Sequence, residues 1–255
     1  MLTTSKKTKL GNALKNYRKN YLHGKLTELD ESGTRLMVNT FLTDVLGYSP
    51  IEEIKTEYMI RGTYADYVIQ TKDTRHFLVE VKALSFALSD KHLRQAINYG
   101  ANEGIEWALL TNGRYFEFYK ILFTKPIESR KIFSFDMADG AQLKDCLDLI
   151  QYLHKDAVIN KGLHYLWNKN CALDPTNIAG LLYAKPVTNY IKRALKNKYK
   201  SKFSDDEINV AINNLICQEV NFDHVKPVKS QKLPRKTKKT TVEPTTAATT
   251  DQLPT

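Results

Sequence analysis

The stretch YADYVIQTKDTRHFLVEVK, residues 64–82, decides the fold of this 255-residue chain and holds most of its candidate chemistry. Apolar residues dominate Tyr64–Gln70 and His76–Lys82, and the polar segment Thr71–Thr74 separates them. This pattern predicts two mostly buried strands joined by a turn. Lys55–Ile60 predicts a further strand before them, so we expect a central meander of two or three strands.

Helical periodicity lies on both sides of this meander. Leu36–Leu46 repeats apolar residues at helical spacing and stops at Gly47, which predicts a helix of about four turns. The later elements are a helix opening at Ser89-Asp90, strands at 107–110, 115–119 and 131–135 with an Asn-Gly hairpin between the first two, and a helix at 141–153.

This order of elements predicts an α/β fold, a mixed sheet flanked by helices. We expect that domain to span residues 26–154, with a basic amphipathic helix before it in residues 1–25. An all-helical extension is expected over 155–225. The tail at 226–255 is rich in Lys, Thr and Pro, and we expect it to be disordered because it cannot bury apolar surface.

Composition and charge narrow the classes of function. The chain is 42% hydrophobic and 26% charged, as in soluble globular proteins, and no stretch approaches the ~20 apolar residues of a membrane span. A formal net charge of +10 favours a polyanionic partner. Three scattered cysteines without a CxxC pair predict a reducing, cytoplasmic location, and the start MLTTSKKTKL lacks the apolar core of a signal peptide.

Asp66, Glu80 and Lys82 form the candidate chemical site. Side chains at positions i and i+2 of a strand share a face, so Glu80 and Lys82 project together. Antiparallel pairing would bring the start of one strand, at Asp66, beside the end of the next. Two carboxylates suit Mg²⁺, and Lys82 can position or deprotonate an attacking water. The residues alone equally allow Asp66 to cap a turn and Glu80 and Lys82 to form a same-face ion pair.

Other positions carry weaker signals. Gln95 and Tyr99 are four apart on a predicted helix, so they can line a groove over the site, or Tyr99 can pack at the helix–sheet boundary. Ser204-Asp-Asp-Glu207 predicts a capping box. A basic run is either a solvated face or a surface that tracks phosphates: Lys192, Arg193, Lys196, Lys198, Lys200 and Lys202.

These motifs, taken in order, resemble the PD-(D/E)XK nuclease superfamily. The resemblance rests on Glu31-Ser-Gly-Thr-Arg35, Leu46-Gly47-Tyr48, Asp66, Glu80-Val-Lys82 and Gln95-x-x-x-Tyr99. More narrowly, the set is similar to the N-terminal nuclease domain of type I restriction enzyme R subunits and to predicted type IV restriction endonucleases. The similarity covers residues 28–154, and no helicase-like motor follows it here, so we expect no translocation by this polypeptide.

The resemblance implies a restriction-endonuclease-like fold and hydrolysis of DNA phosphodiester bonds with Mg²⁺, for which Mn²⁺ can substitute, in defence against foreign DNA. It implies metal binding by Glu31, Asp66 and Glu80, and catalysis by Asp66, Glu80, Lys82, Gln95 and Tyr99. The implied partners are DNA and a second copy of the chain or a restriction-system subunit. The alternatives are a catalytically silent nucleic-acid-binding or regulatory module on a nuclease fold, and RNA as the substrate.

Overall fold

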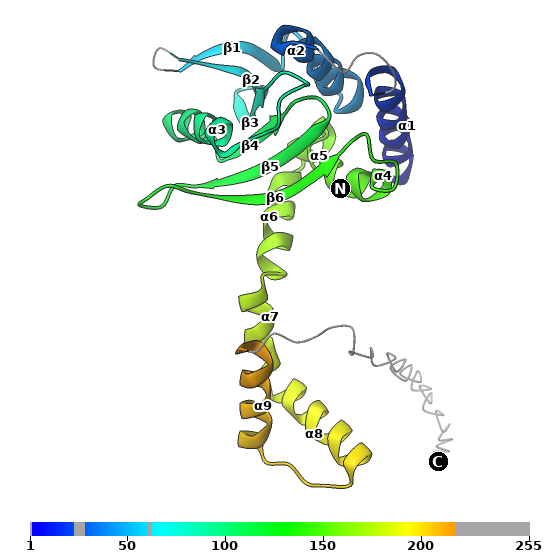
Figure 1. Cartoon of the computed structure of the whole chain (residues 1–255), viewed down its shortest axis with the longest axis vertical. Coiled ribbons are helices and arrows are strands. Elements are labelled where there is room, and N and C mark those ends of the chain that lie inside the picture. The colour runs from blue at the N-terminus through cyan, green and yellow to red at the C-terminus, as the bar shows by residue number, and fades with distance from the viewer. Residues whose placement is uncertain (1, 23–28, 61–62, 218–255) are drawn as a thin grey trace, which may run out of the picture. The chain divides into compact units, whose positions relative to one another are not determined.

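A mixed sheet forms the centre of the protein. The computed structural model describes residues 2–22, 29–60 and 63–217. Six strands lie side by side in chain order: β1 (Ile54–Ile60), β2 (Thr63–Thr71), β3 (Thr74–Val81), β4 (Trp107–Thr111), β5 (Tyr115–Leu122) and β6 (Glu128–Asp136). Neighbouring strands pair antiparallel, except that β3 and β4 are parallel and are joined through the crossover helix α3 (Asp90–Glu103) (Figure 1). The predicted fold class is confirmed.

Helices cover both faces of the sheet. On one face α3 packs over a small core that includes Leu78 and Ala108. The other face carries the larger core, which includes Phe77, Val79 and Val81, because successive strand residues point to opposite faces. The helices that contribute to this larger core are α1 (Thr4–Tyr21), α2 (Glu31–Thr40), its π-helical continuation η2 (Phe41–Val45), α4 (Leu143–Ile150), α5 (Lys155–Ile159) and α6 (Gly162–Ala172).

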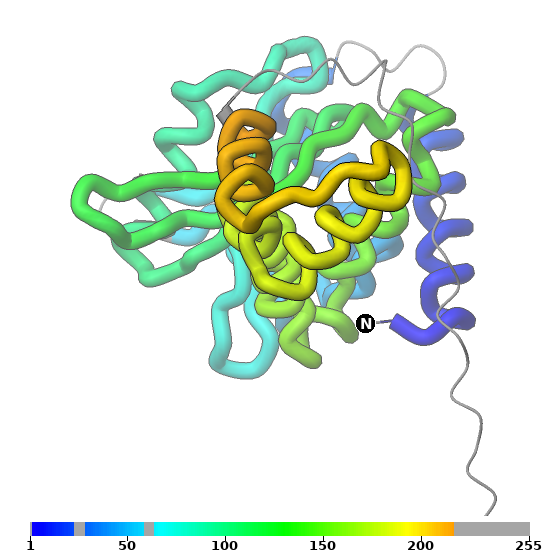
Figure 2. Tube along the Cα trace, turned by 90° about the horizontal axis from the view of Figure 1, so that it is seen from below, coloured from blue at the N-terminus to red at the C-terminus, as the bar shows by residue number. Residues whose placement is uncertain are grey.

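The N-terminal helix is part of this core and is not a separate basic segment. Leu10, Leu14 and Tyr17 are buried on α1, and the Tyr17 hydroxyl donates a 2.8 Å hydrogen bond to the Gly113 carbonyl. Figure 2 shows α1, in dark blue, along one side of the domain, and the two helices α1 and α4 contact each other. Periodicity predicts the helix, but it does not reveal the surface against which its apolar side packs. The end of the predicted helix, residues 23–25, lies outside the described residues.

The C-terminal helices divide between two compact units, Met1–Ala184 and Lys185–Thr255. The residues of α5 and α6 were expected in a helical extension, yet Val158, Leu163 and Leu166 are buried in the core of the first unit. The structure therefore places the division later in the chain than the expected boundary after residue 154.

The first unit ends with α7 (Pro175–Leu182), and the second contains α8 (Lys185–Tyr199) packed against α9 (Asp205–Cys217). The predicted disordered tail, 226–255, lies outside the described residues. Within the described part of the chain, no helix combines the length and the apolar character needed to cross a membrane.

Candidate active site

The pairing of β2 and β3 brings Asp66 and Glu80 together. The two strands are antiparallel, and Tyr67 lies opposite Val79. Asp66, just before Tyr67, therefore lies beside Glu80, just after Val79. Asp66 Oδ2 accepts a 2.7 Å hydrogen bond from the Val81 backbone N–H, which fixes the Asp66 side chain across the strand pair. The structure thus assembles the two carboxylates in the way that the strand pattern predicts.

Lys82 holds the Glu80 carboxylate. The Lys82 Nζ donates a 2.7 Å hydrogen bond to Glu80 Oε1 and lies 3.8 Å from Glu31 Oε2. The Glu80 side chain is only 1% exposed and that of Lys82 13%, so water screens their attraction little. The i, i+2 spacing along β3 therefore produces a close, largely buried ion pair at the strand end.

Arg35 also belongs to this cluster, although the sequence pattern predicted no role for it. Its guanidinium lies 2.5 Å from Asp66 Oδ1 and 2.9 Å from Glu31 Oε1, so it bridges helix α2 and strand β2. The Arg35 carbonyl also accepts a 2.8 Å hydrogen bond from the Tyr67 hydroxyl. The signal in the sequence was the four-residue spacing from Glu31, which puts the two side chains on one helical face.

The cluster carries more negative than positive charge. Three carboxylates, Glu31, Asp66 and Glu80, face two cations, Arg35 and Lys82. Burial, with the neighbouring Asp66 charge, raises the pKa of Glu80 to about 7 although Lys82 opposes the shift. Burial also raises the pKa of Asp66 above its ordinary value, against the Val81 hydrogen bond and the charge of Arg35.

Lys82 stays a cation in this setting. Burial alone would lower the pKa of its ammonium, but the hydrogen bond to Glu80 and the surrounding carboxylates outweigh burial and raise that pKa. The ammonium is therefore suited to holding an anion or orienting a water molecule, and is poorly suited to removing a proton at neutral pH.

One buried oxygen of the cluster lacks a partner. Glu80 Oε2 has no hydrogen bond to any described residue. A buried acceptor without a partner is costly, and here it adds to the excess negative charge. Both observations fit a divalent cation held by Asp66 and Glu80 together with waters.

The third predicted ligand is not assembled with the other two. In the described part of the chain, no three His, Cys, Asp or Glu side chains converge as a metal-ligand set. Glu31 reaches the cluster through Arg35 and Lys82, and its side chain is 40% exposed. The predicted set of three carboxylates is therefore present only as a buried pair with Glu31 beside it.

Gln95 and Tyr99 lie on α3, which covers the sheet face that Leu78 and Glu80 share. Gln95 Nε2 donates a 2.9 Å hydrogen bond to the Tyr99 hydroxyl, and Tyr99 is packed in the small core with Leu78. In the described part of the chain their hydrogen bond is to each other, not to Asp66, Glu80 or Lys82. The structure thus places this pair on the correct face without bringing it into the carboxylate cluster.

Two buried polar side chains anchor the segment that follows Lys82. Thr34 Oγ1 of α2 accepts a 2.9 Å hydrogen bond from the Leu84 N–H. Asn112 of the β4–β5 turn donates to the carbonyls of Leu84 and Phe86, and its Oδ1 accepts from the Tyr115 N–H. The sequence identifies Asn112 as a hairpin residue, but its role as a clamp depends on contacts distant in the chain.

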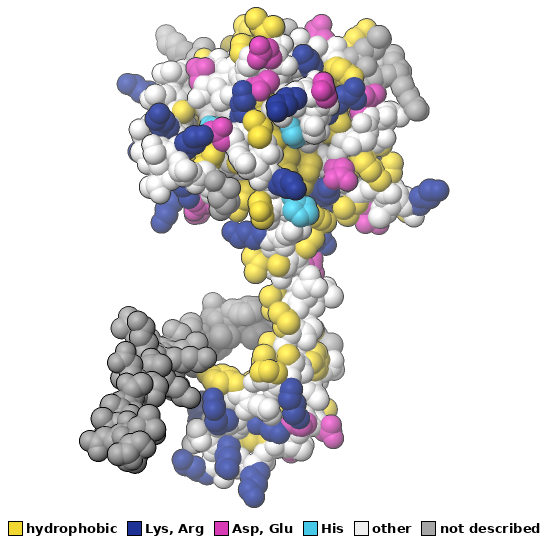
Figure 3. Space-filling view, turned by 180° about the vertical axis from the view of Figure 1, so that it is seen from behind, with side chains coloured by type: hydrophobic (Ala, Val, Ile, Leu, Met, Phe, Trp, Pro, Cys, Tyr) yellow, Lys and Arg dark blue, Asp and Glu magenta, His cyan; other side chains and the backbone are white. Residues whose placement is uncertain are grey.

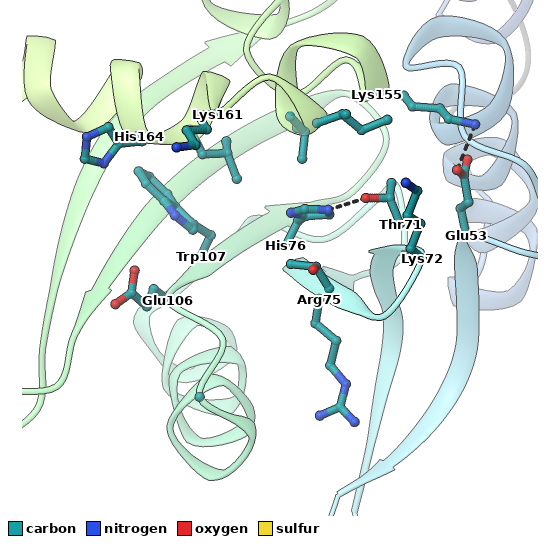
Figure 4. Close-up of a pocket in the computed structure, with 15 residues that line it drawn as sticks. Glu53, Thr71, Lys72, Arg75, His76, Glu106, Trp107, Lys155, Lys161 and His164 are labelled. Atoms are coloured by element: carbon teal, nitrogen blue, oxygen red, sulfur yellow. Dashed lines mark hydrogen bonds and ion pairs between the residues drawn. The ribbon is translucent and has the colours of Figure 1, made fainter.

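A cavity of about 750 Å³ lies at the opposite end of these strands (Figure 4). Thr74 and His76, at the start of β3, line it, whereas Glu80 lies at the end of that strand. Trp107 also lines it, and Lys155 pairs with Glu53 at its edge. Because none of the clustered carboxylates reaches this cavity, we locate the candidate site at the carboxylate cluster.

The segment that contains this cluster also matches a known protein family. Residues 30–128 match the family model described as the type I restriction enzyme R protein N terminus. The matched segment contains every residue proposed for the site and covers less than half of the 255 residues. No curated protein and no solved structure gave a match. The resemblance read from the sequence is thus confirmed: residues 30–128 are similar to the N-terminal domain of type I restriction enzyme R proteins.

Proposed function

We propose that this chain is a metal-dependent endonuclease that hydrolyses DNA phosphodiester bonds in a restriction system. The family match indicates a nuclease-like role in restriction. The observation that carries the proposal is the buried Glu80 carboxylate beside Asp66 and Lys82, one oxygen of which has no partner among the described residues. A strand pair held only for stability would gain nothing from an unsatisfied, charged group at this position.

Asp66 and Glu80 would hold the Mg²⁺ or Mn²⁺ ion. Such an ion supplies charge neutralisation at the scissile phosphate and acidifies a water molecule. The bridge from Arg35 to Asp66 keeps that carboxylate oriented and ionised. Glu31, whose Oε1 contacts Arg35, would be the third ligand of the ion.

Lys82 would orient the attacking water and stabilise negative charge at phosphorus, since its raised pKa keeps it protonated. Gln95 and Tyr99 would reach a bound phosphate from α3 by exchanging the hydrogen bond between them. The proposed partners are DNA and a second copy of the chain or another restriction subunit, because cutting both strands takes two active sites.

Replacing Lys82 with Gln is expected to lower DNA cleavage by about 10²–10³-fold or more, because charge stabilisation at the phosphate is lost. The full chain would be incubated with plasmid, linear and single-stranded DNA and with RNA, in Mg²⁺, Mn²⁺ or EDTA. Lys91→Gln is the matched control, since Lys91 is exposed on α3 and is not part of the cluster.

Metal-dependent cleavage of DNA by wild type and by Lys91→Gln, with loss in Lys82→Gln, is the predicted result. Cleavage of RNA in preference to DNA would contradict the substrate. Absence of cleavage for every substrate and metal, together with no Mg²⁺ binding, would favour the silent binding module. A thermal melt of each variant separates loss of chemistry from loss of the folded state.

A further inference from the structure

The second compact unit contains the basic helix α8, in which some cations form ion pairs and others do not. Asp205, at the start of α9, pairs with both Lys185 and Lys192 of α8. The predicted capping box is also formed: the Ser204 N–H donates to Glu207 Oε2 at 2.7 Å, and the Glu207 N–H donates to Ser204 Oγ. Asp205 is therefore paired with the side of α8 that contacts α9, and Glu207 caps the start of α9.

The other cations of α8 have no acidic partner among the residues that the structure describes. We define the outer strip as Tyr190, Arg193 and Lys196, which follow one another on α8 at spacings of three residues, together with Lys200, the first residue after the helix end. Such spacing places residues on one side of a helix. Arg193, Lys196 and Lys200 are exposed, and in the described part of the chain none of them has an ion pair. Lys and Arg side chains gather over this helix in Figure 3.

Stabilisation of α8 explains the presence of only some of these cations. Cations in the last turn interact favourably with the helix dipole, which accounts for Lys196 and Lys198. It does not account for Arg193, which precedes the last turn, or for Lys200 and Lys202, which follow the helix end at Tyr199. Five cations within residues 193–202, with no acid among them, repel one another unless a polyanion lies nearby.

The geometry of the strip suits a row of phosphates. From Tyr190 to the helix end at Tyr199 the helix rises about 14 Å, a length along which one strand of duplex DNA carries roughly four phosphates. The Arg193 guanidinium lies 5.9 Å from the centre of the Tyr190 ring, which restricts its motion and keeps its fork of donors at the surface.

We propose that the outer strip of α8 binds the sugar–phosphate backbone of duplex DNA without reading base sequence. The choice of DNA as the polyanion rests on the proposed function, whereas the charge and its arrangement do not. The strip would hold the substrate through a surface separate from the carboxylate cluster, so that affinity and cleavage can be changed independently.

The test compares two triple variants of the full chain that lose the same charge. One variant changes the strip: Arg193→Gln, Lys196→Gln and Lys200→Gln. The control changes three exposed lysines of the first unit that form no ion pair with any described residue: Lys15→Gln, Lys125→Gln and Lys144→Gln. Binding to a fluorescent duplex is measured in EDTA, without cleavage, over a series of salt concentrations.

The strip variant should bind less tightly, and the slope of log affinity against log salt should become shallower by about 2–3, since each phosphate contact contributes roughly 0.9. The control should keep the wild-type slope. Equal changes in the two variants, or tighter binding of duplex RNA than of DNA by wild type, would overturn the proposal. Loss of cleavage activity would not affect this result, so failure of the nuclease proposal is recognised separately.

Discussion

Replacing Glu80 with Gln is expected to make the metal-free protein more stable at neutral pH and to abolish DNA cleavage. Glu80 has a pKa of about 7 in the folded protein against an ordinary value of 4.5. Because folding raises this pKa, the folded state favours the protonated carboxyl group. The protonated group therefore contributes its full stabilisation below pH 4.5, and this stabilisation is lost as pH rises through about 7.

The Gln side chain keeps the shape of protonated Glu and still accepts from Lys82, and it removes the excess negative charge of the cluster. The difference in free energy of unfolding should therefore grow from near zero at about pH 4.5 to about 3 kcal/mol at neutral pH, since each pKa unit corresponds to about 1.4 kcal/mol. Urea unfolding of both proteins in EDTA across this pH range measures the difference in free energy of unfolding. Glu128→Gln, an exposed change on β6, is the control.

The outcome separates a functional site from a structural ion pair. If Glu80 and Lys82 serve stability, Glu80→Gln will be less stable than wild type at neutral pH. If they serve chemistry, the variant gains stability and loses activity together, a trade that is common at active sites. A loss of activity accompanied by unfolding would give no support to the proposed role of Glu80.

Replacing Arg35 with Met is expected to lower the free energy of unfolding by about 2–4 kcal/mol at neutral pH. The change leaves the Asp66 carboxylate, whose side chain is 6% exposed, without its cationic partner. Breaking a fully buried pair costs about 3–5 kcal/mol, and the cost is smaller here because the Arg35 side chain is 35% exposed.

The loss should depend on pH in a defined direction. Without Arg35 the pKa of Asp66 rises further, so acid neutralises the uncompensated carboxylate and the deficit shrinks as pH falls. Arg114→Met is the control, because the Asp136 carboxylate that it would leave unpaired is 18% exposed, against 6% for Asp66, and the change should therefore cost less, about 1 kcal/mol. Equal costs for Arg35→Met and Arg114→Met at neutral pH would show that the bridge to Asp66 contributes little.

Local patterns were sufficient for the strands and for the core of the site. The apolar run through residues 76–82 and the polar turn before it predicted the β2–β3 pair, and that pair brings Asp66 to Glu80. The hairpin at Asn112-Gly113 and the capping box at Ser204 follow equally local rules. Each of these features depends on residues close together in the chain.

Features that depend on distant contacts were not predictable in the same way. The bridge from Arg35 to Asp66 joins a helix to a strand, and the spacing from Glu31 indicates only the helical half of it. The helix expected over residues 36–46 widens into a π-helical turn, which lets Phe41, Leu42 and Val45 all be buried. For Tyr99 the sequence left two positions open, lining a groove or packing at the helix–sheet boundary, and the structure has it packed in the small core.

Calorimetric titration of Mg²⁺ into the full chain near pH 7 would show whether the Asp66–Glu80 pair holds a metal ion. Because Glu80 has a pKa of about 7, it is about half protonated there, and metal binding should release up to about half a proton per ion. Repeating the titration in buffers of different ionisation enthalpy counts those protons. Wild type should bind Mg²⁺ with proton release, and Glu80→Gln should show neither. Absence of binding in wild type, or binding that Glu80→Gln leaves unchanged, would contradict a metal site at this pair.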